Sequence, residues 1–128
     1  APDLVALAES VDILVIATSG GKQTAKLVNA DVIAALGPDG MLVNIARGSI
    51  VDEDALVMAL AQGRLGSAAL DVFAQEPQVP EALIAMENVV LLPHQGSATA
   101  ETRAQMGRLT MDNLHAHFGG RPLITPLW

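Results

Sequence analysis

The sequence predicts an α/β fold in which helices cover a parallel sheet. Short runs that are apolar throughout alternate with segments of helical periodicity, and glycine or proline separates them. Strands that are apolar throughout are typical of a parallel sheet that is buried on both faces. Strands that alternate with helices are joined by right-handed crossovers, so we expect one doubly wound α/β layer.

Four segments are expected to form the strands of this sheet. Each is a short apolar run bounded by turn residues, and the third has side chains small enough for a crowded sheet. The four segments are 12–18, 41–46, 67–73 and 89–92.

Two helices are expected between these strands. Asn29 is suited to the N-cap of a helix that ends at Leu36, before a Gly-Pro-Asp-Gly turn. Asp52 is suited to the N-cap of the next helix, where Glu53 and Asp54 occupy the favourable first turn. Gly63 is expected to stop that second helix.

Three further helical segments are expected, at 4–10, 80–86 and 99–118. The middle one has room for one or two turns, and two glycines stop the last one. The segment at 4–10 has no strand before it, so we expect the chain to begin in the middle of a sheet.

Composition and charge exclude several classes of protein. The chain has 128 residues, enough for one domain, and 51% of them are apolar, which excludes a disordered protein. No apolar run approaches the ~18 residues of a membrane helix. A net charge of −7 and the lack of a basic stripe exclude a duplex nucleic-acid binder, and the absence of cysteine excludes thiol chemistry. No initiator methionine or apolar leader begins the sequence, so we expect a cytoplasmic chain with apolar surface left for something else to cover.

Uncommon polar residues follow the predicted strands at their carboxyl ends, where ligands bind in an open parallel sheet. Arg47 follows the second strand, Asp71 and Glu76 follow the third, and His94 follows the fourth. Taken singly, each of three residues has an ordinary structural interpretation. Arg47 could belong to a surface ion pair, Glu76 could lie in a solvated turn, and His94 could be an ordinary loop histidine. Asp71 is harder to dismiss, because a buried carboxylate without a partner is costly. Together they predict a site for acid–base chemistry.

Other motifs in the sequence give weaker evidence for a function. His115 and His117 are two residues apart on a helix, so they point to different faces and no zinc site is expected. Ser19-Gly20-Gly21 could cradle a phosphate, but it is also a common turn. The sequence contains neither a P-loop nor a GxSxG elbow, and it contains no GxGxxG.

Three blocks of the sequence resemble the D-2-hydroxyacid dehydrogenase family. They are VNIARGSIVDE at 43–53, LDVFAQEP at 70–77 and LPHQGSAT at 92–99. Two shorter matches, GGKQT at 20–24 and LITP at 123–126, look like the glyoxylate/hydroxypyruvate reductase branch. The resemblance runs over essentially the whole chain.

The resemblance implies a Rossmann-like fold. Residues 1–98 look like the second half of a NAD(P)-binding domain, and residues 99–128 look like the helix and tail that return to a substrate domain. The family's glycine-rich loop, its ribose-reading residue and most of the substrate domain have no counterpart here.

The resemblance also implies a role for each strand-end residue. Arg47 resembles the arginine that holds the carboxylate and carbonyl of a 2-keto acid, which suits its two-pronged guanidinium. His94 resembles the proton donor, and Glu76 the carboxylate that orients its imidazole. Asp71 resembles the residue that anchors the nicotinamide carboxamide.

Further residues look like positions that contact the cofactor, which is NADP or NAD with NADP favoured. They are Ser19, Ile45, Ala46, Gly96 and Ser97. The implied function is hydride transfer between this cofactor and a small 2-keto or 2-hydroxy acid such as glyoxylate or hydroxypyruvate, in a homodimer. Two alternatives stay open: a NAD-sensing interaction protein similar to corepressors of this fold, and an isolated fragment without activity of its own.

Overall fold

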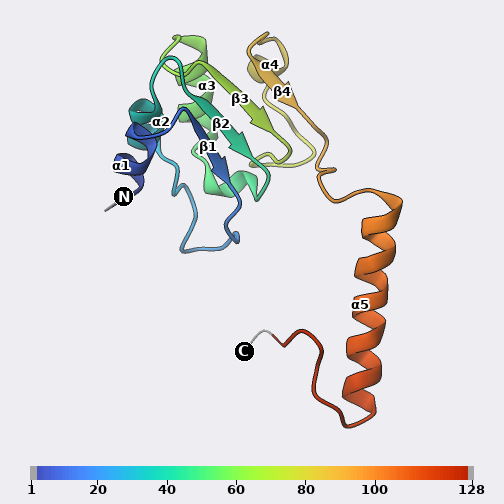
Figure 1. Ribbon diagram of the computed structural model, residues 1–128. Coiled ribbons are helices and arrows are strands. Elements are labelled where there is room, and N and C mark those ends of the chain that lie inside the picture. The colour runs from blue at the N-terminus through green and yellow to red at the C-terminus, as the bar shows by residue number, and fades with distance from the viewer. Residues whose placement is uncertain (1–2, 127–128) are drawn as a thin grey trace. The chain divides into compact units, whose positions relative to one another are not determined.

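The computed structural model describes residues 3–126 as two compact units, Ala1–His94 and Gln95–Trp128 (Figure 1). The first unit holds a four-stranded sheet with its helices, and the second holds one long helix and the tail that follows it.

All four strands of the sheet are parallel, and they lie side by side in chain order. They are β1 (Ile13–Ile16), β2 (Met41–Asn44), β3 (Ser67–Leu70) and β4 (Val89–Leu91). The predicted parallel α/β architecture is thus confirmed. The sheet is wound in one direction only, as expected for one half of a doubly wound sheet.

Short helices precede or connect the strands of the first unit. They are α1 (Leu4–Glu9), α2 (Ala30–Leu36), the 3-10 turn η1 (Gly48–Ile50), α3 (Glu53–Ala61) and α4 (Glu81–Ile84). Asn29 caps α2 as predicted, because its side-chain oxygen accepts the N–H groups of Asp31 and Val32. Asp52 occupies the N-cap position of α3, but its carboxylate pairs with Lys26 Nζ at 3.1 Å instead of capping the helix.

Each strand is shorter at its carboxyl end than predicted, which places the polar residues in loops. The first residues past the strands still donate their N–H groups to the neighbouring strand, as Asp71 does to the Asn44 carbonyl at 3.0 Å. The chain then turns away from the ladder. Loops along one edge of the sheet therefore carry the residues that the sequence singled out.

The described residues of the first unit bury only one face of the sheet. Leu14, Leu42 and Ala68 point to the core, whereas Val15 and Val90 on the other face are 55% and 60% exposed. The prediction of strands buried on both faces is therefore wrong for this chain. Right-handed crossovers between strands laid down in one direction all fall on the same side of a sheet, which leaves the second face uncovered.

The second unit contains α5 (Ala100–Phe118), which Thr99 caps by accepting the Thr102 N–H at 3.2 Å. The tail is held to this helix by Asn113, whose side-chain oxygen accepts the N–H groups of Ile124 and Thr125. In the described part of the chain, no helix has both the length and the apolar character needed to cross a membrane.

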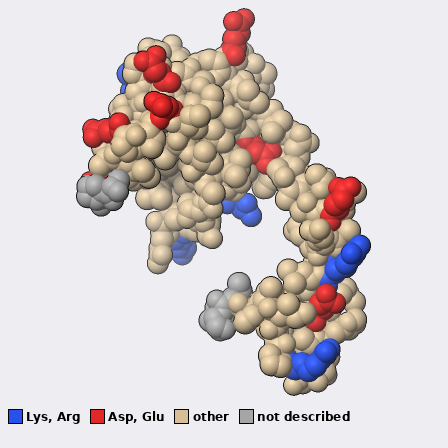
Figure 2. Space-filling model, in the orientation of Figure 1, with Lys and Arg blue, Asp and Glu red and all other residues tan. Residues whose placement is uncertain are grey.

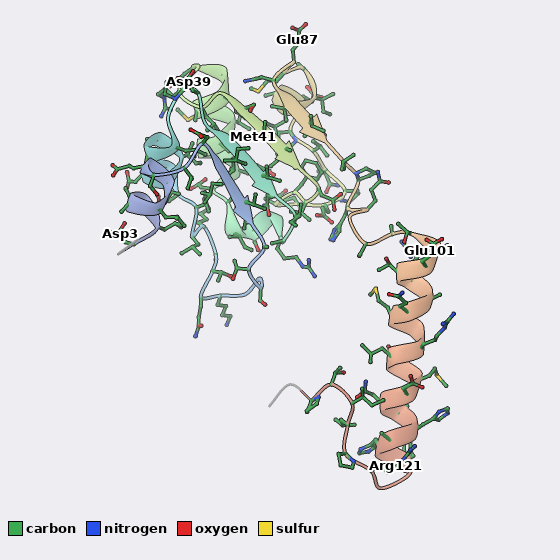
Figure 3. All side chains as sticks on the ribbon, viewed as in Figure 1. Asp3, Asp39, Met41, Glu87, Glu101 and Arg121 are labelled. Atoms are coloured by element: carbon green, nitrogen blue, oxygen red, sulfur yellow. The ribbon has the colours of Figure 1, made fainter. Side chains whose placement is uncertain are left out.

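Charged side chains are sparse on the surface, and most of the face in Figure 2 carries neither sign. In the first unit, acidic residues precede three of the strands: Asp12 stands directly before β1, Asp39 lies beside the amino end of β2, and Glu87 beside that of β4 (Figure 3). The cation and the imidazole described below lie at the opposite, carboxyl edge.

Candidate active site

An open depression lies at the carboxyl ends of β1 and β2. Its volume is about 650 Å³. The residues that line it are Ala17, Thr18, Ser19, Gly20, Gly21, Ile45, Ala46, Arg47 and Ser49. Three of the residues predicted to contact a cofactor, Ser19, Ile45 and Ala46, thus share one surface with Arg47.

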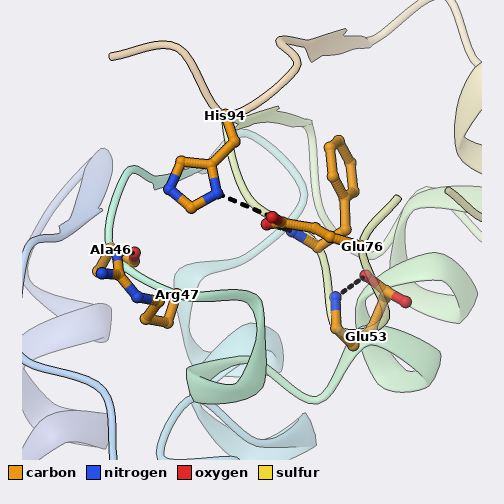
Figure 4. A network of polar contacts seen from close by, with 7 residues as sticks. Ala46, Arg47, Glu53, Glu76 and His94 are labelled. Carbon is orange, nitrogen blue, oxygen red and sulfur yellow. Dashed lines mark hydrogen bonds and ion pairs between the residues drawn. The ribbon is translucent and has the colours of Figure 1, made fainter. Parts of the chain in front are cut away.

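Glu76 and His94 form a hydrogen-bonded pair at the same edge. Glu76 Oε2 lies 2.8 Å from His94 Nδ1 (Figure 4). The other carboxylate oxygen accepts the Phe73 N–H at 3.0 Å, so both oxygens of Glu76 are engaged. The sequence prediction that Glu76 and His94 come together is therefore matched by the geometry.

The pKa of Glu76 is lowered. The hydrogen bond with His94 is the largest cause, followed by the hydrogen bond from the Phe73 N–H. Burial acts in the opposite direction and is the third cause in size, and the charges of His94 and Arg47 lower the pKa by smaller amounts. An ionised carboxylate accepts hydrogen bonds through both of its oxygens, so Glu76 can hold the His94 ring in one orientation.

His94 directly follows Pro93 at the end of β4 and has a φ of +51°. This left-handed backbone conformation is uncommon outside glycine, although histidine is among the residues that adopt it more readily. Backbone strain of this kind collects at functional sites. The residue in this conformation is the one whose Nδ1 pairs with Glu76.

Arg47 is exposed on the segment between β2 and η1. Its Nη1 donates to the Ala46 carbonyl at 2.6 Å, and Figure 4 shows it on the same side of the loops as His94. The aliphatic part of the side chain packs on Gly20, since a Cβ added there would lie 2.7 Å from Arg47 Cγ. Gly20 thus leaves the space that this arginine needs.

Asn44 shapes the turn that presents Arg47, and it is not among the residues predicted to form the site. It is 1% exposed at the end of β2. Its Nδ2 donates to the Arg47 carbonyl and its Oδ1 accepts the Ala46 N–H, both at 3.1 Å. A polar residue that ends an apolar strand was the signal that could have identified it.

Asp71 follows β3 at the same edge and is 5% exposed. Its position agrees with the predicted location, and its contact with a nicotinamide stays a prediction. Gly96 and Ser97 belong to the second unit. Their predicted contact with the cofactor also stays a prediction.

The depression suits part of a dinucleotide. It lies outside the carboxyl ends of parallel strands, where such ligands bind, and pockets of ~300–1,000 Å³ take ligands of drug size. Glycine backbone at Gly20 and Gly21, a serine hydroxyl and a guanidinium are suitable donors for anionic and amide groups. Within residues 3–126, no group of three or more His, Cys, Asp or Glu side chains could hold a metal ion.

The chain is similar to several named reductases. It is 56% identical over 124 residues to a hydroxyphenylpyruvate reductase of Plectranthus scutellarioides, covering 97% of this chain and 40% of that protein. It is 56% identical over 126 residues to glyoxylate/hydroxypyruvate reductase A of Arabidopsis thaliana, covering 98% of this chain and 40% of that protein. The chain thus spans about 40% of the length of these curated relatives.

A solved structure shows the same fold at high similarity. The NADPH-dependent glyoxylate/hydroxypyruvate reductase of Sinorhizobium meliloti, in complex with NADP and malonate, superposes with a TM-score of 0.95 at 52% identity, over 99% of this chain and 40% of that one. Residues 1–96 also match the sequence profile of the "D-isomer specific 2-hydroxyacid dehydrogenase, NAD binding domain". The chain therefore belongs to the D-isomer-specific 2-hydroxyacid dehydrogenase family, and residues 1–96 match the NAD-binding domain of that family.

Proposed function

We propose that this chain supplies the catalytic edge of a NAD(P)-dependent reductase that converts small 2-keto acids to D-2-hydroxy acids. The observation that carries the proposal is the Glu76–His94 pair at 2.8 Å, on the same loop edge as Arg47. A guanidinium that is held in place can bind the carboxylate of a keto acid. A protonated imidazole that is held at the same edge can then donate its proton to the neighbouring carbonyl oxygen.

Each residue has a separate task in this proposal. Arg47 binds the substrate carboxylate and holds the carbonyl in place through a planar fork. Glu76 holds His94 Nδ1, so Nε2 is the nitrogen that gives its proton to the carbonyl oxygen. Asp71, Ser19, Ile45, Ala46, Gly96 and Ser97 are the proposed cofactor contacts, with Asp71 at the carboxamide.

The dinucleotide, when bound, supplies the hydride, and the protein supplies position and electrostatics. NADPH is the proposed form, because the similar Sinorhizobium enzyme is described as NADPH-dependent and holds NADP. Glyoxylate and hydroxypyruvate are the proposed substrates on the same grounds. The Plectranthus relative, equally similar over this segment, is named for a larger aromatic acid, so the choice of acid depends on residues outside it.

The test uses the complete protein, meaning the gene product that contains these 128 residues. Its oxidation of NADPH is followed at 340 nm with glyoxylate, hydroxypyruvate and hydroxyphenylpyruvate, and with NADH in parallel. We expect turnover of at least one of the first two acids with NADPH. Absence of turnover with every combination of keto acid and cofactor would overturn the proposal.

The isolated 128 residues serve as a second arm of this test. We expect no turnover from them, because they span only about 40% of the length of the relatives. Measurable reduction by the isolated chain would show that these residues suffice. No observation supports the alternative of a NAD-sensing interaction protein, since the relatives described above are named as reductases.

A homodimer in the cytoplasm is also part of the proposal. Large apolar side chains such as Val15 and Val90 are exposed in this chain, and surface of that kind is normally covered in an assembly or by further chain. Light scattering of the complete protein tests the dimer, and cell fractionation tests the compartment. A mass of one subunit would remove the dimer from the proposal.

A further inference from the structure

The loop that carries Glu76 is held by two carboxylates. Glu76 Oε1 accepts the Phe73 N–H at 3.0 Å, and Glu53 Oε2 accepts the next N–H along the chain, that of Ala74, also at 3.0 Å. The first contact is made within the loop. The second comes from the first turn of α3, 21 residues away, and is drawn in Figure 4.

The same short stretch of backbone rests directly on the segment that follows Arg47. A Cβ added to Gly48 would lie 2.0 Å from the carbonyl carbon of Phe73 and 2.5 Å from the Ala74 nitrogen. Gly48 begins η1, and α3 begins after it, so one continuous stretch of chain carries Arg47, contacts the loop at Gly48 and holds it at Glu53.

A simpler role for Glu53 is available. An acidic residue in the first turn of a helix is stabilised by the helix dipole, and Asp54 in the same turn has that benefit too. The two residues differ in their contacts: Asp54 is exposed, and of the two only Glu53 accepts a hydrogen bond from the loop. The dipole does not account for this contact.

We propose that Glu53 is a positioning residue for the Glu76–His94 pair, because it fixes the backbone from which Glu76 reaches His94. This inference rests on the proposed function of that pair. Without the Glu53 contact, the Ala74 N–H loses its acceptor, and the Phe73–Glu76 loop keeps its internal hydrogen bond to Glu76 and its packing against Gly48. The Glu76 side chain and the His94 ring then sample other orientations, and a misplacement of ~1 Å costs up to ~10²-fold in rate.

The experiment compares three variants of the complete protein. Glu53→Ala removes the acceptor, Glu53→Gln keeps an oxygen that can accept the Ala74 N–H, and Asp54→Ala is the matched control that removes the neighbouring acid of the same helical turn. We expect kcat to fall about 10-fold or more in Glu53→Ala. We expect Glu53→Gln and Asp54→Ala to stay near the wild-type kcat, and the KM for the keto acid to change little in all three.

A second readout does not depend on turnover. The pKa of Glu76, followed by carbon NMR of its carboxyl group, is lowered by its partners in the intact loop. In Glu53→Ala it should rise towards the ordinary value, and in Asp54→Ala it should not move. If Glu53→Ala does not fold, Glu53→Asp shortens the side chain by one methylene and keeps the charge, and the same changes are expected there.

Two results overturn the inference: a Glu53→Ala enzyme with the kcat and Glu76 titration of Asp54→Ala, or a Glu53→Gln enzyme as impaired as Glu53→Ala. The latter would assign the effect to the charge at the helix end. A wild-type protein that turns over no keto acid would instead refute the proposed function, and the NMR titration would still decide whether Glu53 positions Glu76.

Discussion

At the scale of single residues, the proton-donating role of His94 depends on which ring nitrogen Glu76 holds. Glu76 binds Nδ1, so Nε2 is left to face a substrate. His94→Gln removes the titratable donor, and in the complete protein we expect kcat to fall by about 10² or more, as is usual for loss of a general acid. Steady-state kinetics with glyoxylate and hydroxypyruvate measure this. Near-normal turnover would exclude the assignment.

Arg47 is expected to act on substrate binding. A lysine in its place keeps the charge but cannot present two parallel N–H groups to a carboxylate. Arg47→Lys should therefore raise the KM for the keto acid about 10-fold with a smaller change in kcat. Lys26→Arg, a change of the same kind at a surface ion pair, is the control and should leave both constants unchanged. An unaltered KM in Arg47→Lys would contradict the role.

The Glu76–His94 hydrogen bond also predicts a dependence of stability on pH. The pKa of Glu76 in the folded chain is below its ordinary value of 4.5. The unfolded chain therefore binds more protons at acidic pH, and the stabilising contribution is complete above that value and is lost as pH falls through the folded pKa. We expect the free energies of unfolding of wild type and Glu76→Gln, measured in urea between about pH 6 and pH 3, to converge towards the acidic end. Parallel curves would contradict the pKa shift.

At the scale of elements, the turn between β2 and η1 depends on Asn44. Asn44→Ala leaves the Ala46 N–H and the Arg47 carbonyl without their partner, and loss of a buried partner costs about 1–3 kcal/mol. Urea unfolding should show this loss of stability. Steady-state kinetics of the complete protein should also show a raised KM for the keto acid, because Arg47 moves. Asn88→Ala, which removes one exposed hydrogen bond at the opposite edge, is the control and should cost less.

The elements were predictable where a local signal defines them. The capping side chain of Asn29 and the four apolar runs are signals of this kind, and the structure bears them out. The strand ends were placed too late, because apolar residues such as Ile45 and Val72 continue past the ladder into the loops. Asp52 sits at the expected cap position, yet Lys26, distant in sequence, takes its carboxylate.

The site was predictable for a related reason. Parallel strands bring their carboxyl ends to one edge, so Arg47, Glu76 and His94 could be expected together from their places after the strands. The contacts of Glu53 with Ala74 and of Gly48 with Phe73 join segments more than 20 residues apart. No local pattern marks them, because they follow from how the loops pack.

At the scale of the whole molecule, the described residues of the first unit leave one face of their sheet uncovered. Val15, Val43, Ala69 and Val90 stand in register across the four strands on that face. The isolated 128-residue chain should therefore self-associate, and Val15→Lys with Val90→Lys should increase its monomer fraction in light scattering. Met58→Lys, at an equally exposed apolar residue on α3, is the control. A wild-type chain that is already monomeric would refute this prediction.

The half-covered sheet also bears on how the protein is made in a cell. Until the uncovered face meets its cover, a growing chain presents apolar strands and two unpaired edges, β1 and β4, to other unfinished chains. Changes on this face should then alter the yield of folded protein per ribosome and the demand for chaperones, while each molecule that matures turns over normally. Variation at Val15 or Val90 should therefore appear as a difference in abundance.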